Sequence, residues 1–283
     1  MPLADLLGRY RRVRQRSLSV CAPLSAEDAQ IQSMPDVSPA KWHLAHTTWF
    51  FETFVLARLG DRPLDASFDF LFNSYYETVG ARVERARRGL LSRPSLAAVH
   101  AYRTAIDARM EEVLGAGRLD PTLGGELVAV VELGLQHEQQ HQELLYTDIK
   151  HVLGTQPLRP AYRADLARPA GARAEPARWI ELDGGIVEIG AAGEGFAFDC
   201  ERPRHRVLLE PYRLASRPIC NAEVLAFIAD GGYREPRLWL SDGWAVVQRE
   251  GWQAPLYWEA RDGGWLQYTL GRIDLAHAAE RVL

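Results

Sequence analysis

The sequence predicts a helical bundle followed by a separate domain of mixed helices and strands, an α plus α+β organisation. In residues 1–153, four segments carry apolar side chains at steps of three and four, the spacing of one helix face. Residues 154–178 hold four prolines among alanines and arginines, a composition typical of a linker. In residues 179–283, short apolar stretches alternate with glycine-rich turns, which is typical of short strands. A chain of 283 residues is long enough for two such domains.

The composition excludes several classes of protein. With 47% hydrophobic and 25% charged residues, the chain has the balance of a soluble globular protein. A formal net charge of −4 argues against non-specific binding to nucleic acid or to an anionic membrane. Three scattered cysteines do not make a disulfide framework, and no apolar run approaches the ~20 residues of a membrane span. We therefore expect a cytoplasmic protein with neither nucleic-acid nor membrane partners.

The first two predicted helices differ in how clearly their ends are marked. Residues 3–17 place leucines and Tyr10 on one face and arginines on the other. The second helix is predicted to begin at Ser38, a hydroxyl N-cap followed by Pro39, and to end at Gly60. Its buried face is predicted to contain Trp42, His46, Trp49, Phe50, Phe54 and Ala57.

Two more helices follow an irregular stretch at 61–93, whose length is uncommon in a compact domain unless the stretch has a function. The third predicted helix spans 94–114. His100 falls outside the apolar face of this helix and is expected at the surface. Its inward positions are Val99, Tyr102, Ile106, Met110 and Val113. The fourth predicted helix spans 122–153, with an inward stripe of Leu127, Val130, Gly134, His137, His141, Leu144 and Asp148.

The second domain is predicted in less detail. Residues 179–190 read as two short strands around an Asp-Gly-Gly turn, and 205–209 read as another strand. Residues 221–230 are predicted to form a short helix. The tryptophan- and glycine-rich remainder is typical of a loop-rich α+β domain.

The stripe on the last bundle helix contains half of a metal site. Residues four apart on a helix have Cβ atoms roughly 5–6 Å apart, so His137 and His141 can both bind one ion. Both could instead be ordinary core histidines, but burying two imidazoles without a function costs free energy. His46, in the middle of the aromatic face of the second helix, is the best third ligand. Three imidazoles suit iron, zinc or copper and leave one side of the metal open.

The same residues also match the His-Glu-x-x-His motif of zinc proteases. In that motif the glutamate, here Glu138, is the general base. The third ligand of such a protease is missing, because Thr147 stands where one subclass has histidine and the linker follows. A bundle that binds a metal or a thiol without oxidation chemistry is a further alternative.

Five segments in order resemble one known family along nearly the whole chain. They are Ser38–Glu52, Leu71–Glu77, Arg88–Pro94, His137–Glu143 and Phe196–Arg206. Together they resemble the ergothioneine sulfoxide synthases, whose close relatives are the selenoneine synthases. The resemblance implies a DinB-like four-helix bundle followed by a formylglycine-generating-enzyme-like (sulfatase-modifying) domain of C-type-lectin fold. It also implies that this second domain is incomplete at Leu283.

The resemblance further implies an oxidoreductase that contains non-haem Fe(II). The iron ligands would be His46, His137 and His141, and the betaine substrate hercynine would be held in part by Gln140. Tyr75 and Tyr76 would stand beside the iron as proton or hydrogen-atom donors. The implied reaction uses O2 to join a sulfur or selenium donor to C2 of the hercynine imidazole.

The donor is left open by the sequence. Arg82 and Arg85 are candidates for binding a substrate carboxylate, a task suited to the guanidinium fork, although a solvated arginine face is the simpler interpretation. The segment around them departs from the Arg-His-Pro-Arg-Pro-like run expected for the family, and Cys200 replaces a frequent asparagine. The donor is therefore a thiol, such as cysteine or γ-glutamylcysteine, or a selenosugar.

Overall fold

The computed structural model divides the chain into two compact units, Met1–Arg163 and Ala164–Leu283. The division falls within the stretch that we interpret as a linker. Tyr162 is buried in the first unit, where its hydroxyl donates a hydrogen bond to the carbonyl of Val20. The residues described are 3–74, 80–115, 121–166, 175–193, 195–261, 264–271 and 273–275.

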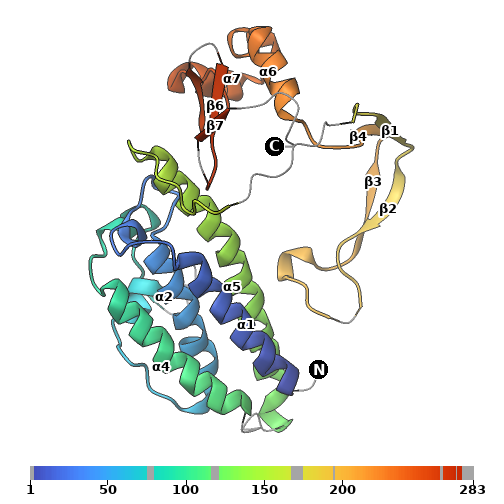
Figure 1. Cartoon of the computed structure of the whole chain (residues 1–283). Coiled ribbons are helices and arrows are strands. Elements are labelled where there is room, and N and C mark those ends of the chain that lie inside the picture. The colour runs from blue at the N-terminus through green and yellow to red at the C-terminus, as the bar shows by residue number, and fades with distance from the viewer. Residues whose placement is uncertain are drawn as a thin grey trace. The chain divides into compact units, whose positions relative to one another are not determined.

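The first unit is a bundle of four long helices, as predicted (Figure 1). α1 and α2 each contact both α4 and α5, and they also contact each other. A short helix, α3, joins the bundle beside α2. The helices are α1 (Leu3–Cys21), α2 (Ala40–Phe51), α3 (Phe68–Phe72), α4 (Leu96–Gly115) and α5 (Pro121–Thr155). Within the described part of the chain, no helix has the length and apolarity needed to cross a bilayer.

The start of α2 differs from the prediction. Ser38 does not cap the helix, because Pro39 is the N-cap residue and no side chain caps it. The backbone N–H of Ser38 instead donates to Asp148 on α5, and its hydroxyl accepts from Arg88. The predicted end is confirmed: α2 continues through a π-helical turn and a 3-10 turn to Gly60, which stops it at φ +91°.

The inward face of α5 is rotated slightly from the predicted stripe. Leu144 is 41% exposed, whereas Leu145 is buried, so the prediction for Leu144 is wrong. The most deeply buried polar side chain of the helix is Glu138, at 0% exposure. α1 also departs from the prediction at one position. The arginines of this helix are predicted on its outer face, but Arg14 is only 3% exposed. On α4, all five predicted inward positions are buried and His100 is exposed, as predicted.

The second unit begins with a long two-stranded antiparallel ribbon (Figure 1). β1 (Trp179–Leu182) pairs with β4 (Tyr212–Ala215), and β2 (Gly185–Ile189) pairs with β3 (His205–Leu209). The register is continuous, since Leu182 faces Tyr212 and Gly185 faces Leu209. The Asp-Gly-Gly segment therefore interrupts one ribbon and does not reverse the chain, contrary to the prediction. Gly184 and Gly185 lie at φ +73° and +96°, which lets the strand bend there.

The remainder of this unit contains two helices and a small sheet. α6 (Asn221–Ala229) confirms the predicted helix, whereas α7 (Ser241–Glu250) was not predicted. β5 (Trp258–Arg261), β6 (Gly264–Tyr268) and β7 (Ile273–Leu275) form an antiparallel sheet in that order. The unit thus has the expected α+β character.

Candidate metal centre

His46 is held rigidly in the interior of the bundle. Its ring stacks on Trp42 with a centroid separation of 4.6 Å and is also stacked with Trp49 at 5.8 Å. Nδ1 of His46 lies 2.6 Å from the carbonyl oxygen of Phe72. A carbonyl only accepts, so Nδ1 carries the proton and Nε2 presents a lone pair.

The structure brings His46 together with His137 and His141. Nε2 of His137 lies 3.2 Å from Nε2 of His46 and 3.1 Å from Nε2 of His141. One nitrogen from each of the three rings lies within 4.8 Å of the others. His46 is buried, whereas His137 and His141 keep part of their surface exposed. The cluster is therefore anchored on α2 and partly open on the side of α5.

Burial keeps all three rings neutral near pH 7. Desolvation is the main cause that lowers the pKa of His46 and His141 well below the usual value, and neighbouring imidazoles add to the effect. Desolvation likewise lowers the pKa of His137 to about 4, although nearby Glu138 opposes the shift. Neutral imidazole is the form that binds a metal ion.

The donor set and its geometry fit a metal ion. Two nitrogens at about 2.1 Å from one ion are about 3.0 Å apart at a right angle and about 3.4 Å apart in a tetrahedron. The observed separations of 3.1 and 3.2 Å fall between these values. Nδ1 of His137 is buried without a hydrogen-bond partner among the described residues, so no protein group there fixes the proton on this ring. Three neutral nitrogens facing one point are best satisfied by a cation.

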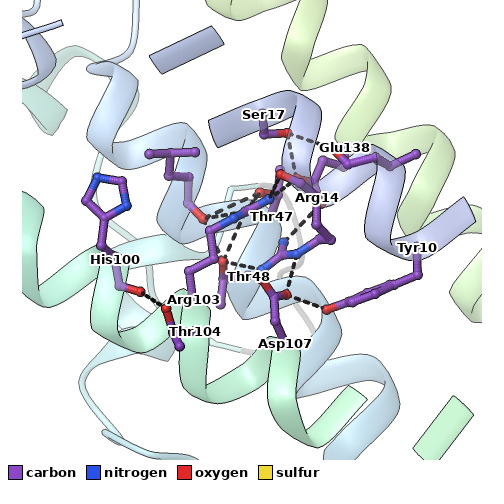
Figure 2. Close-up of polar contacts among 12 residues, drawn as sticks. Tyr10, Arg14, Ser17, Thr47, Thr48, His100, Arg103, Thr104, Asp107 and Glu138 are labelled. Atoms are coloured by element: carbon purple, nitrogen blue, oxygen red, sulfur yellow. Dashed lines mark hydrogen bonds and ion pairs between the residues drawn. The ribbon is translucent and has the colours of Figure 1, made fainter. Parts of the chain in front are cut away.

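The side chain of Glu138 belongs to a polar network in the interior of the bundle, together with Arg14 and Ser17 (Figure 2). Its carboxylate accepts hydrogen bonds from Arg14 at 2.9 Å, Ser17 at 2.6 Å and Arg103 at 2.5 Å. Burial opposes ionisation of Glu138, but Arg103 and Arg14 outweigh it and lower the pKa of the carboxyl to about 2. A fully buried carboxylate bound by two guanidinium groups cannot act as the general base of a zinc protease. The protease interpretation is therefore not favoured.

The network around Glu138 joins the four helices of the bundle. Arg14 also bonds Asp107 on α4 and Thr48 on α2. Tyr10 donates to Asp107, and Arg103 reaches the hydroxyl of Thr47. Thr47, Thr48 and Glu138 are neighbours of His46 and His137 in the sequence, so this network fixes the backbone that carries two of the three histidines. The ring of His100 lies outside the network (Figure 2).

The structure does not test the functions predicted for the other site residues. Tyr75 and Tyr76 lie outside the described residues. Gln140 is exposed on α5, one position before His141. Arg82 and Arg85 are exposed, and the guanidinium of Arg85 donates to the carbonyl of Asp36. Their assigned functions stay predictions.

Arg88 is the arginine that lies near the cluster, and sequence reasoning did not separate it from its neighbours. It is 4% exposed and its guanidinium carbon lies 3.4 Å from the ring centroid of Trp42. It donates to the hydroxyls of Ser38 and Ser74. Its charge contributes to the lowered pKa of His46 and His141. The only signal for it in the sequence is its place at the start of the Arg88–Pro94 segment.

Comparison with known proteins shows which families the chain is similar to. Residues 9–145 match the DinB superfamily. The hercynine oxygenase of Mycolicibacterium smegmatis is 31% identical over 90% of this chain, which covers 56% of that protein. The hercynine oxygenase of Mycobacterium tuberculosis is 30% identical over 98% of this chain and 62% of its own length. That of Mycolicibacterium thermoresistibile is 29% identical over 90% of this chain and 55% of its own length.

The similarity thus spans both units, while the chain covers little more than half the length of these relatives. The helical bundle of the first unit is thus similar to the DinB superfamily, and the chain as a whole is similar to the hercynine oxygenases at about 30% sequence identity.

Proposed function

We propose that the chain catalyses O2-dependent formation of a carbon–sulfur bond at C2 of the hercynine imidazole, as an ergothioneine-type sulfoxide synthase. The observation that carries the proposal is the convergence of three neutral imidazoles in a chain similar to hercynine oxygenases over 90–98% of its length. Fe(II) held by His46, His137 and His141 would supply the oxygen chemistry. The donor is a thiol such as cysteine or γ-glutamylcysteine.

The chain's own residues would hold and orient the reactants. The stacking of His46 between Trp42 and Trp49 keeps one ligand fixed, while the partly exposed His137 and His141 leave a side through which substrate can approach. Gln140, which is exposed and directly precedes His141 in the sequence, would help to hold the betaine, as the resemblance to the sulfoxide synthases implies.

Three further assignments are part of the proposal. Arg82 and Arg85 would bind a substrate carboxylate, and Tyr75 and Tyr76 would donate a proton or hydrogen atom. The second unit would be a formylglycine-generating-enzyme-like domain. This last assignment is supported by its small antiparallel sheets, its short helices and the similarity that extends over it.

The test is anaerobic reconstitution of the 283-residue chain with Fe(II), followed by measurement of O2 uptake and of products by mass spectrometry. Reactions contain hercynine with cysteine, with γ-glutamylcysteine or with a selenosugar. We expect equimolar iron binding and O2 uptake that requires both hercynine and a thiol, with a hercynine–thiol adduct as product. An iron-loaded chain that forms no such adduct with a thiol would refute the proposed reaction, and an adduct formed only with the selenosugar would refute the assigned donor.

Two histidine variants separate the metal site from general effects of mutation. His46→Ala removes a buried, doubly stacked ligand and should abolish both iron binding and O2 uptake. His100→Ala removes an exposed imidazole on α4 and should match the unmodified protein in both measurements. Equal iron binding by the two variants would show that His46 is not a ligand.

A further inference from the structure

Behind His141 lies a chain of hydrogen bonds that ends at a buried carboxylate. Nδ1 of His141 is 2.8 Å from Nδ1 of His43, and Nε2 of His43 is 2.9 Å from Oδ2 of Asp148. The same carboxylate oxygen accepts the backbone N–H of Ser38 at 2.9 Å. His43 and Asp148 are 2% and 6% exposed, so water competes little for these bonds.

The direction of each bond follows from the chemistry of the carboxylate. An oxygen that receives two N–H groups acts as an acceptor only, so Nε2 of His43 carries the proton that it donates to Asp148. In a neutral His43 ring, Nδ1 then holds a lone pair and must accept. The proton between His43 and His141 therefore belongs to Nδ1 of His141.

This assignment leaves Nε2 of His141 with a lone pair at the point where the three histidines meet. That nitrogen is 3.1 Å from Nε2 of His137. His46 reaches the same state by a different route, because the carbonyl of Phe72 accepts the proton of its Nδ1. Acceptor-only groups thus determine the tautomers of two of the three rings.

We propose that Asp148 and His43 are positioning residues that hold His141 in its Nδ1–H tautomer and present its Nε2 to the metal ion. The proposal rests on the metal centre proposed above. Partners of this kind orient metal-binding histidines, and their loss typically lowers metal affinity 10- to 100-fold.

The tautomers can be observed directly in the metal-free protein. Nitrogen-15 NMR of imidazole-labelled protein distinguishes Nδ1–H from Nε2–H rings. We expect an Nε2–H signal for His43 and an Nδ1–H signal for His141, each assigned by the loss of its signal in the corresponding substitution. In Asp148→Leu, which removes the acceptor, the Nδ1–H form of His141 should lose its preference. An Nε2–H form of His141 in the unmodified protein would overturn the proposal.

Metal affinity gives an independent test through two substitutions of His43, measured by anaerobic Fe(II) titration. His43→Asn places a carbonyl oxygen near the position of Nδ1 and can still accept from His141, so it should bind Fe(II) within a few-fold of the unmodified protein. His43→Phe fills the volume of the ring without an acceptor and should bind Fe(II) about 10- to 100-fold more weakly. A merely structural role of His43 predicts the reverse order, because phenylalanine packs better than asparagine in a buried site.

Asp148 provides a second pair in case a His43 variant does not fold. Asp148→Asn keeps an oxygen acceptor and should retain most of the affinity, whereas Asp148→Leu should lose it about 10- to 100-fold. His151→Phe is the matched control for His43→Phe. It also replaces a buried imidazole with phenylalanine, but this imidazole lies on α5 and is bonded to Ser33.

The outcomes separate this proposal from the proposed metal centre. If the unmodified protein does not bind Fe(II), the metal centre is refuted, while the tautomer measurement still tests the positioning by Asp148 and His43. If the unmodified protein binds Fe(II) and His43→Phe binds it equally well, the positioning proposal is overturned and the metal centre stands. Equal weakening in His43→Phe and His151→Phe also overturns the positioning proposal.

Discussion

Replacing Glu138 with glutamine tests whether this residue stabilises the bundle core or performs catalysis. The carboxylate is fully buried and accepts hydrogen bonds from Arg14, Ser17 and Arg103. With Asp107, it balances the two positive charges of Arg14 and Arg103. Glutamine keeps the shape of the side chain but removes one negative charge, and it places an amide N–H group against guanidinium donors.

The expected cost follows from this imbalance. Removing one partner of a buried ion pair costs about 3–5 kcal/mol, because the remaining charge is left uncompensated. For a domain the size of the first unit, 1 kcal/mol corresponds to about 2–4 °C in melting temperature. Glu138→Gln should therefore lower the melting temperature of the bundle by about 6–20 °C.

Thermal unfolding followed by far-ultraviolet circular dichroism reports on the bundle, which contains the longest helices of the chain. Glu143→Gln on the same helix is the control. The side chain of Glu143 is exposed, so this substitution should change the free energy of unfolding by no more than about 0.5 kcal/mol. The double variant Arg103→Met/Glu138→Gln removes one charge of each sign and should cost less than the sum of the single variants. If Glu138→Gln is as stable as Glu143→Gln yet inactive, our assignment of Glu138 to the core is wrong.

Two more predictions concern the same core. The carboxyl of Glu138 has a pKa of about 2 against an ordinary 4.5, so its stabilisation is present above pH 4.5 and is lost as the pH falls toward 2. Denaturant titrations at several pH values measure the free energy of unfolding. Between pH 4.5 and 2, this free energy should fall by up to about 3 kcal/mol more in the unmodified protein than in Glu138→Gln. Equal pH dependence of the two proteins would contradict the assignment. A Cβ added at Gly134 would lie 2.7 Å from Phe51 and 2.8 Å from Phe50, so Gly134→Ala should destabilise the bundle by about 1–3 kcal/mol. A Cβ added at Gly125, on the same helix, would have no other atom within 4 Å, so Gly125→Ala should stabilise the bundle by up to about 1 kcal/mol. Equal shifts in melting temperature for the two alanine variants would refute the packing argument.

Local periodicity was enough to predict most of the bundle. Helical spacing located the long helices, and all five inward residues predicted on α4 are buried. The four-residue step between His137 and His141, together with the aromatic face around His46, was also enough to select the three histidines that the structure brings together. These predictions succeed because a helix repeats every 3.6 residues, so the sequence alone states which side chains share a face. Whether the three histidines bind iron stays a prediction.

Contacts between segments far apart in the sequence decided the rest. Successive residues on a helix differ by about 100° in direction, so only the packing of neighbouring helices determines that Leu145 and Glu138, and not Leu144, face the core. Likewise, Arg14 and Arg88 are buried because partners on other segments satisfy their charges and hydrogen bonds. In the second unit, the Asp-Gly-Gly segment is a bend and not a reversal because the pairing strand continues past it in the same register. Local sequence determines which elements form, whereas buried charge and strand pairing depend on partners that only the folded chain brings together.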